Sequence, residues 1–311
     1  MNKISIVGAG MTGATTAHWL AERELADLVL VDVVEGMPQG KGLDMLEAMP
    51  IIGRDVRISG ANDYAATKDS DIIIITAGLP RKPGMSRDDL LSANAEIVGT
   101  AATETLKHAP DAIYIVLTNP LDTMAYLTMK KTGLPRERVI GQAGILDSAR
   151  MRAFVAMETG VSVENIDCYV LGGHGDEMVP LTRHSNIAGI PLKEYLPAEK
   201  LEAIVARTRK GGGEIVNLLK TGSAFYAPSA ACAQMAEAIL KNKHLIVPCA
   251  AYMDGEYGLN DMFFGVPVML GRTGMERIIE YKLDDDEKTM FDKSAAAVKE
   301  THEALKKLVK I

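Results

Sequence analysis

The sequence predicts an α/β fold in which an N-terminal doubly wound parallel sheet is followed by a C-terminal α+β domain. Short, β-branched, nearly continuous apolar runs alternate with helix-like segments in the first half of the chain, which is the pattern of a parallel sheet covered on both faces. In the second half this alternation loosens and helical stretches dominate. The predicted strands of the first half are residues 4–7, 28–31, 71–75 and 113–117.

Glycine or polar residues follow each of these predicted strands. Gly8, Asp32, Thr76 and Asn119 stand at or just beyond the four strand ends. In open parallel sheets, ligands bind outside the carboxyl ends of the strands. We therefore expect the functional site at this edge.

The length of 311 residues suits two domains, and we place their boundary where the alternation ends. The first domain is expected at residues 1–143 and the second at residues 144–311. Within the second, residues 166–171 are strand-like, the three consecutive glycines at 211–213 predict a loop or an interrupted helix, and residues 287–310 predict an amphipathic helix.

Composition excludes several classes of protein. The net charge of −7 and the lack of a basic run argue against nucleic-acid binding, and no apolar run is long enough for a membrane span. The three cysteines have no CxxC spacing, so neither a disulfide framework nor a metal site is expected. With no signal-peptide pattern in the opening residues, we expect a cytoplasmic protein.

A glycine motif follows the first predicted strand. Gly8, Gly10 and Gly13 form G-x-G-x-x-G between this strand and a predicted helix at residues 14–22. The first glycine permits a tight turn, the second lets a diphosphate approach the backbone, and the third allows close helix packing. The helix N-terminus then faces the anion. This context favours a dinucleotide site in a Rossmann domain over a simple tight turn.

Asp32 indicates which dinucleotide binds. It closes the second strand about 20 residues after the glycines, where a carboxylate accepts hydrogen bonds from the ribose hydroxyls and repels a 2′-phosphate. The following Val33 and Val34 offer no arginine to bind a 2′-phosphate, so NAD is favoured over NADP. Asn119, at the end of another strand, has an amide suited to orienting a substrate oxygen or the nicotinamide ribose, although a turn role before Pro120 is the alternative.

A candidate proton-transfer group lies in the second half. His174 follows a strand-like run and stands among glycines, so its ring is free to project into a cleft. Asp147 and Arg150 have the i, i+3 spacing that places two side chains on one helix face, where one can hold the histidine and the other a substrate. Alone, this pair would more often be a surface ion pair.

Together these residues resemble the malate and lactate dehydrogenase family, and within it the bacterial, lactate-dehydrogenase-like malate dehydrogenases. The resemblance spans the whole chain. The segments that carry it are residues 8–13, 32, 76–78, 81–87, 118–120, 146–150 and 172–175. It implies an NAD-dependent, reversible hydride transfer between (S)-malate and oxaloacetate.

The resemblance also implies a role for each matching residue. His174 would accept and donate the proton, with Asp147 as its partner, and Arg150 would hold the C1 carboxylate. Arg87 would polarise the carbonyl from a closing loop, and Asn119 would orient substrate and cofactor. The implied cofactor contacts are Gly8, Gly10, Met11, Gly13, Asp32, Thr76, Ala77, Gly78, Asn94, Leu117 and Asn119.

Arg81 distinguishes malate from lactate in this interpretation. Arg81 places a second guanidinium on the loop at residues 81–87, and this cation needs a second carboxylate. Malate has that carboxylate and lactate lacks it. Lactate enzymes of the family usually carry glutamine at this position. Closing the loop over lactate would leave a buried, unpaired cation, at a cost of roughly 3–5 kcal/mol. The predicted substrate-binding set is therefore Arg81, Arg87, Asn119 and Arg150.

Three alternatives remain open. A lactate or other 2-hydroxy-acid dehydrogenase would use the same chemistry with a different side pocket. A non-catalytic NAD-sensing protein would keep the fold without turnover, and an NAD-using glycosidase-like enzyme would need a metal site, for which no Cys/His cluster is apparent. The resemblance also implies a homo-oligomer, either a homotetramer or a dimer.

Overall fold

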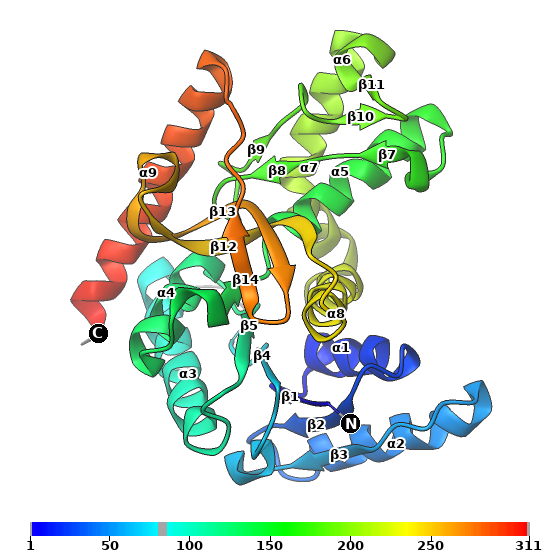
Figure 1. Ribbon diagram of the computed structural model, residues 1–311, viewed down its shortest axis with the longest axis vertical. Helices are drawn as coiled ribbons and strands as arrows, with labels where there is room; N and C mark the ends of the chain where they lie inside the picture. Colours follow the sequence, from blue (N-terminus) through cyan, green and yellow to red (C-terminus); the bar gives the residue numbers. More distant parts are fainter. Residues whose placement is uncertain (1, 80–85, 310–311) are drawn as a thin grey trace.

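The computed structural model describes residues 2–79 and 86–309. Figure 1 shows a lower part built on one large sheet and an upper part that holds short strands and long helices. Within the described residues the large sheet has nine strands in the order β14-β13-β12-β6-β5-β4-β1-β2-β3. The α/β prediction is confirmed.

Six parallel strands form the first part of this sheet. In sequence they are β1 (Lys3–Val7), β2 (Asp27–Val31), β3 (Ile58–Ala61), β4 (Ile72–Ile75), β5 (Ile113–Val116) and β6 (Val139–Gly141). Their spatial order 3-2-1-4-5-6 is that of a doubly wound dinucleotide-binding sheet, with the change of direction between β1 and β4. All four residues of β4 are fully buried, as the continuous apolar pattern predicts.

Helices α1 to α4 connect these strands and cover both faces of the sheet. They are α1 (Met11–Glu22), α2 (Met37–Ile52), α3 (Arg87–His108) and α4 (Leu121–Thr132). A capping box starts α3, where the Ser86 side chain accepts the N–H of Asp89 and the Asp89 carboxylate accepts the N–H of Ser86. The N-termini of α1 and α4 lie at the carboxyl edge of the sheet, where the site was expected.

The upper part follows β6. It holds α5 (Gly144–Thr159), the short strands β7 (Ile166–Asp167), β8 (Val170–Leu171), β9 (Val179–Pro180), β10 (Asn186–Ile187) and β11 (Ile190–Pro191), and the helices α6 (Leu192–Tyr195) and α7 (Ala198–Leu219). A separate core, with Met151 of α5 and Ile204 of α7, fills this part. Its helix α5 brings the Asp147 and Arg150 positions to the edge of the main sheet.

The chain then returns to the large sheet. Helix α8 (Tyr226–Leu240) packs on α1, where the hydroxyl of Ser229 donates to the carbonyl of Thr12 at 2.8 Å. The antiparallel strands β12 (Leu245–Asp254), β13 (Asn260–Gly271) and β14 (Gly274–Ile278) extend the sheet beyond β6 through the pair Ala250 and Gly141. Helix α9 (Asp285–Leu308) runs along one side (Figure 1). The predicted boundary at residue 143 remains a prediction.

Two expectations for the second half were wrong. Residues 211–213 lie inside the uninterrupted helix α7, where Gly211 and Gly212 face the side chain of Arg150, as described below. Residues 166–171 are not one strand but two, since β7 pairs with β10 and β8 pairs with β9. The strands β3, β6 and β12 to β14 were not anticipated.

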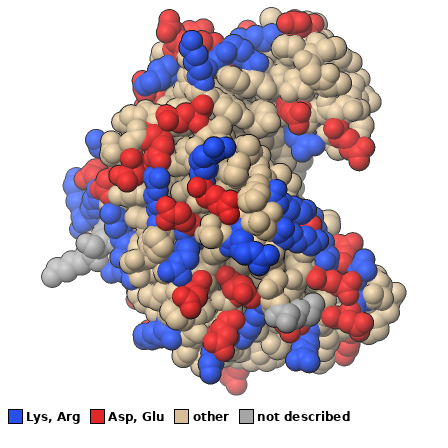
Figure 2. Space-filling view, viewed as in Figure 1, with Lys and Arg blue, Asp and Glu red and all other residues tan. Residues whose placement is uncertain are grey.

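The surface carries both charge signs interspersed. Figure 2 shows acidic and basic side chains mixed over the visible face, with a hollow on the right-hand edge between the upper and lower parts. Among the helices of the described residues, none combines the length and the apolar character that crossing a membrane requires.

Candidate active site

The glycine loop after β1 has the geometry of a diphosphate cradle. Gly8 has a φ of +101°, and a Cβ there would lie 2.6 Å from the backbone nitrogen of Ala77. A Cβ on Gly13 would lie 1.8 Å from the carbonyl oxygen of Gly8, so helix and loop could not approach as they do. At Gly10 a Cβ would meet nothing within 4 Å. The loop is thus tight on its inner side and open on the outer side.

The start of α1 adds donors to this cradle. Gly10 is the N-cap and Met11 the first helical residue, and no side chain caps the helix. The N–H groups of the first turn are therefore available to an anion, which the positive end of the helix dipole also attracts. This arrangement fits the diphosphate of NAD, and the nicotinamide of a bound NAD would supply the hydride acceptor.

Asp32 lies at the end of β2 and holds the glycine loop. Its Oδ2 accepts the N–H of Ala9 at 2.7 Å, and its Oδ1 accepts the N–H of Val34 at 3.0 Å. Each carboxylate oxygen retains a lone pair, which suits hydrogen bonds from ribose hydroxyls. On α2, the ammonium of Lys41 donates to the carbonyl of Ala9 at 2.7 Å. Both the N–H and the carbonyl of Ala9 are thus hydrogen-bonded to side chains.

The predicted contacts after β4 and β5 form one connected edge. The hydroxyl of Thr76 donates to the carbonyl of Gly8 at 2.9 Å, and the N–H of Ala77 donates to Val7. Buried Asn94 accepts the N–H of Leu79 and donates to the carbonyl of Asn119 at 2.7 Å. Gly78 packs against Asn94 and Thr118, and Leu117 bonds to the backbone of β4. These bonds fix the loops that would face the cofactor.

His174, Asp147 and Arg150 meet beside this edge. The Nδ1 of His174 lies 2.8 Å from Oδ2 of Asp147, and the NH1 of Arg150 donates to Oδ1 of the same carboxylate at 3.0 Å. The Asp147 side chain is 2% exposed, His174 15% and Arg150 12%. The structure therefore brings together the three side chains that the sequence singled out, and their catalytic roles remain predictions. With Nδ1 engaged, Nε2 of His174 is the nitrogen free for proton transfer.

The surroundings of His174 favour its protonated form. Burial by itself would lower the pKa of the ring, but the negative charge and the hydrogen bond of Asp147 outweigh burial. The charge of Asp122 acts in the same direction and that of Arg150 opposes it, so the pKa of His174 is raised from its ordinary value. The imidazole is a stronger base here than in water.

The guanidinium of Arg150 is packed against α7. Its NH2 lies 3.6 Å from the position that a Cβ on Gly212 would occupy, and its Cδ lies 3.1 Å from a Cβ on Gly211. The buried Nε of Arg150 has no hydrogen-bond partner among the described residues. A planar cation with an unused buried donor is suited to binding a carboxylate through two parallel hydrogen bonds.

The sequence reasoning missed two residues near the site. Asp122, on the first turn of α4, accepts the backbone N–H of His174 at 2.9 Å. Lys41 reaches the glycine loop from α2. The only signal for Asp122 was an acidic residue shortly after Asn119, and for Lys41 there was none, because tertiary packing alone brings both to the edge.

Two predicted substrate residues are not placed. Arg81 lies outside the described residues, and so does the side chain of Arg87, whose backbone opens α3. Asn119 is placed, with its carbonyl bonded to Asn94. The roles of these residues remain predictions.

Comparison with known proteins identifies the family. The family model for the lactate/malate dehydrogenase NAD binding domain matches residues 2–141, and the model for the lactate/malate dehydrogenase alpha/beta C-terminal domain matches residues 145–309. A malate dehydrogenase of Roseiflexus castenholzii is 59% identical over 306 residues, covering 98% of this chain and 99% of the relative. One of Halalkalibacterium halodurans is 56% identical, covering 98% of each chain.

Solved structures extend the likeness to the fold. A malate dehydrogenase from Cryptosporidium parvum has a TM-score of 0.96 at 45% identity, covering 98% of this chain and 99% of that one. A lactate dehydrogenase from Cryptosporidium parvum, in complex with lactic acid and the nicotinamide cofactor, has a TM-score of 0.95 at 40% identity, covering 98% of each. The chain belongs to the lactate/malate dehydrogenase family.

Proposed function

We propose that this protein is an NAD-dependent malate dehydrogenase that interconverts (S)-malate and oxaloacetate. Family membership gives the cofactor and the class of reaction, and the relatives at 59% and 56% identity are named malate dehydrogenases. The observation that carries the proposal is the contact of one buried carboxylate, Asp147, with both the imidazole of His174 and the guanidinium of Arg150.

This contact supports a proton-coupled hydride transfer. Oxidation of the hydroxyl requires a base that takes its proton while the hydride leaves carbon, and Nε2 of His174 is that base. Asp147 holds the ring tautomer and stabilises the imidazolium that forms. In the reverse direction the imidazolium of His174 donates the proton to the carbonyl oxygen. Arg150 binds the C1 carboxylate and fixes which face of C2 meets the nicotinamide.

The other predicted site residues complete this proposal. Asn119 orients the substrate, Arg87 polarises the carbonyl, and Arg81 binds the second carboxylate of malate. The glycine loop and Asp32 hold the dinucleotide, with the remaining contacts along the strand ends described above. Residues 1–143 then form the NAD-binding domain and residues 144–311 the catalytic domain.

A side-by-side assay tests the proposal. We expect NADH oxidation with oxaloacetate to exceed that with pyruvate by at least about 100-fold in kcat/KM, because a second carboxylate pairs a loop cation that pyruvate leaves bare. Equal or faster turnover of pyruvate would support the lactate alternative. NADH binding without turnover of either acid would support the non-catalytic alternative.

Substitution of Arg81 tests the substrate class directly. Arg81→Gln should lose roughly 100-fold or more in kcat/KM for oxaloacetate, with a smaller change for pyruvate. The exposed Arg57 provides a control, since Arg57→Gln should leave both values unchanged. A value for oxaloacetate in Arg81→Gln that equals that of the wild type removes Arg81 from the site.

The assembly and the compartment belong to the same proposal. We expect a homo-oligomer, a tetramer or a dimer, and exposed apolar side chains on α2, among them Leu43 and Ile51, support a subunit contact. Light scattering at assay concentrations measures the mass directly. The three cysteines carry no disulfide in the described residues, which fits a reducing cytoplasmic setting.

A further inference from the structure

Asp122 is a buried carboxyl group that the proposed mechanism leaves unused. It lies on the first turn of α4 and is 6% exposed. Its Oδ2 accepts the backbone N–H of His174 at 2.9 Å, while its Oδ1 has no hydrogen-bond partner among the described residues. Burying a carboxylate with one oxygen unpartnered is costly, and a neutral side chain would hold the same N–H at a lower cost. The charge itself therefore calls for an explanation.

The loop that carries His174 is anchored at two successive residues. The N–H of Gly173 donates to the hydroxyl of Ser294 on α9 at 3.0 Å, and the N–H of His174 donates to Asp122. Ser294 shows that an uncharged oxygen suffices as an anchor in this loop. Asp122 differs from it in being a carboxyl group, whose charge acts on His174 in addition to the hydrogen bond.

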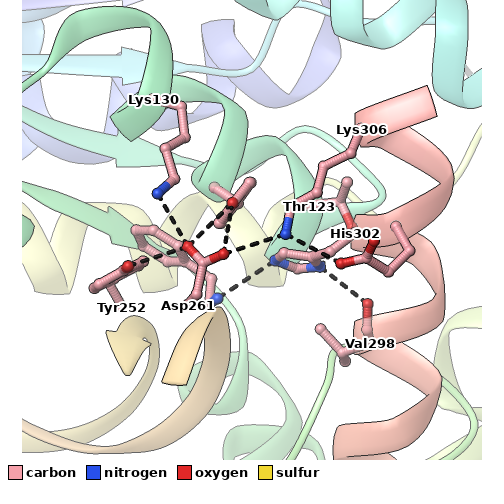
Figure 3. A network of polar contacts seen from close by, with 10 residues as sticks. Thr123, Lys130, Tyr252, Asp261, Val298, His302 and Lys306 are labelled. Atoms are coloured by element: carbon pink, nitrogen blue, oxygen red, sulfur yellow. Dashed lines mark hydrogen bonds and ion pairs between the residues drawn. The ribbon is translucent and has the colours of Figure 1, made fainter. Parts of the chain in front are cut away.

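Helix α4 holds Asp122 rigidly in this position. Farther along α4, the ammonium of Lys130 lies 3.0 Å from Asp261 of β13, which also accepts hydrogen bonds from Lys306 of α9 and Tyr252 of β12 (Figure 3). Next to Asp122, the hydroxyl of Thr123 lies 3.3 Å from Nδ1 of buried His302, also on α9. These contacts hold both ends of α4 and so keep the main chain of Asp122 beside the histidine loop.

Three charged groups of the described residues act on the imidazole of His174: the carboxylates of Asp147 and Asp122 and the guanidinium of Arg150. Asp147 on α5 faces the ring at Nδ1, and Arg150 on α5 offsets part of its charge. On the α9 side the nearby groups are uncharged Ser294 and Val298. Asp122 is thus a second carboxylate near His174 that no arginine or lysine of the described residues neutralises directly.

From these contacts, and resting on the proposed function, we infer that Asp122 is a positioning residue for His174 that also stabilises its imidazolium form by charge. The reaction then uses two carboxylates: Asp147 fixes the ring and Asp122 fixes the main chain. Consistent with this, burial raises the pKa of Asp122 to about 6, against the hydrogen bond and the charge of His174, which lower it. Above that pH Asp122 is ionised, and its charge raises the pKa of His174.

Asp122→Asn is the direct test, because it keeps an acceptor of the same size and removes the charge. Reduction of oxaloacetate needs protonated His174, so kcat/KM falls as pH rises through the pKa of that residue. Without the charge of Asp122 this fall should move to lower pH by about half a unit or more. Oxidation of malate needs the neutral ring, so its rise with pH should move in the same direction.

Two further variants separate charge from packing. Asp261→Asn removes the charge that binds Lys130 at the other end of α4. It should lower the melting temperature and leave the midpoint of the pH profile unchanged. Asp122→Ser, which is also uncharged, should shift the midpoint as Asp122→Asn does, and it provides the measurement should the asparagine variant fail to fold.

A titration without turnover makes the test independent of the activity. The ring carbon signal of His174 in the NADH complex, assigned by its loss in His174→Asn, should titrate at lower pH in Asp122→Asn than in the wild type. An unchanged midpoint in both the titration and the pH profile would reduce Asp122 to a structural anchor and overturn the inference. Failure of the wild type to turn over 2-oxo acids would overturn the proposed function instead, and the titration would still give its answer.

Discussion

The carboxylate of Asp147 serves two partners at once. One oxygen binds the imidazole of His174 and the other the guanidinium of Arg150, at 2.8 and 3.0 Å. Such a buried, shared carboxylate fixes the acid–base group and the substrate-binding cation relative to each other. Removing it would leave both partners uncompensated, at a cost of about 3–5 kcal/mol.

Lys41 contacts the loop that would hold the dinucleotide. Its ammonium donates to the Ala9 carbonyl within the glycine loop, beside the expected diphosphate. Lys41→Met should weaken NADH binding about fivefold to tenfold, because it loses a charge-assisted hydrogen bond and a nearby positive charge, and should leave kcat almost unchanged. Fluorescence titration with NADH measures the dissociation constant.

Two comparisons sharpen this test. Lys107→Met, which removes only a surface ion pair with Glu104, should bind NADH as the wild type does. Lys41→Arg should recover most of the lost affinity. Equal NADH affinity in Lys41→Met and the wild type would leave Lys41 no part in holding the cofactor.

The sequence predicts best those site residues that a local spacing or flanking pattern marks along the chain. His174, Asp147 and Arg150 were found because helical spacing and flanking glycines are visible along the chain. Asp122 lies 52 residues from the histidine whose N–H it accepts. No local pattern encodes such a contact, so only the folded chain places it.

In helix α7, three consecutive glycines led to the prediction of a break that the structure does not have. Residues 211–213 weaken a helix by about 1 kcal/mol each relative to alanine, which is why the sequence predicted a break. The helix persists because the residues before the glycines supply a regular amphipathic pattern, with Ile204 and Thr208 buried. Gly211 instead provides the room that the Arg150 side chain occupies.

Gly211→Ala should therefore separate stability from affinity. The added methyl group would lie 3.1 Å from Cδ of Arg150 and displace its guanidinium, while alanine favours the helix. We expect KM for oxaloacetate to rise about tenfold with no loss of melting temperature. Steady-state kinetics and a thermal melt measure the two effects.

Gly213 is the matched control, because a Cβ there would meet nothing within 4 Å. Gly213→Ala should raise the stability by up to about 1 kcal/mol and leave KM unchanged. A parallel rise of KM in both variants would contradict the role given to Gly211.

The strands of the large sheet also differ in how well the sequence predicts them. The apolar runs that became β1, β2, β4 and β5 were predicted within a residue or two, because strands buried on both faces are continuously apolar. Edge strand β3 contains a glycine and β6 has three residues, so neither gives a clear signal. Their existence depends on neighbouring strands.

At the scale of the molecule, the sequence predicted two parts but not how they join. Strands β12 to β14 belong to the second half of the chain and yet continue the sheet of the first, through Ala250 and Gly141. Helix α8 likewise packs on α1. Both contacts join segments that are far apart in sequence. Both connect the part of the chain that holds His174 to the part that holds the glycine loop.

A crystal structure with NADH and an unreactive dicarboxylate analogue of oxaloacetate would show whether His174, Asp147 and Arg150 hold the substrate as proposed. We expect one carboxylate on the guanidinium of Arg150, and the oxygen that replaces the keto group about 3 Å from Nε2 of His174. Asp147 should still bind Nδ1 of the same ring. A dicarboxylate bound away from Arg150, or an imidazole turned from it, would contradict the account.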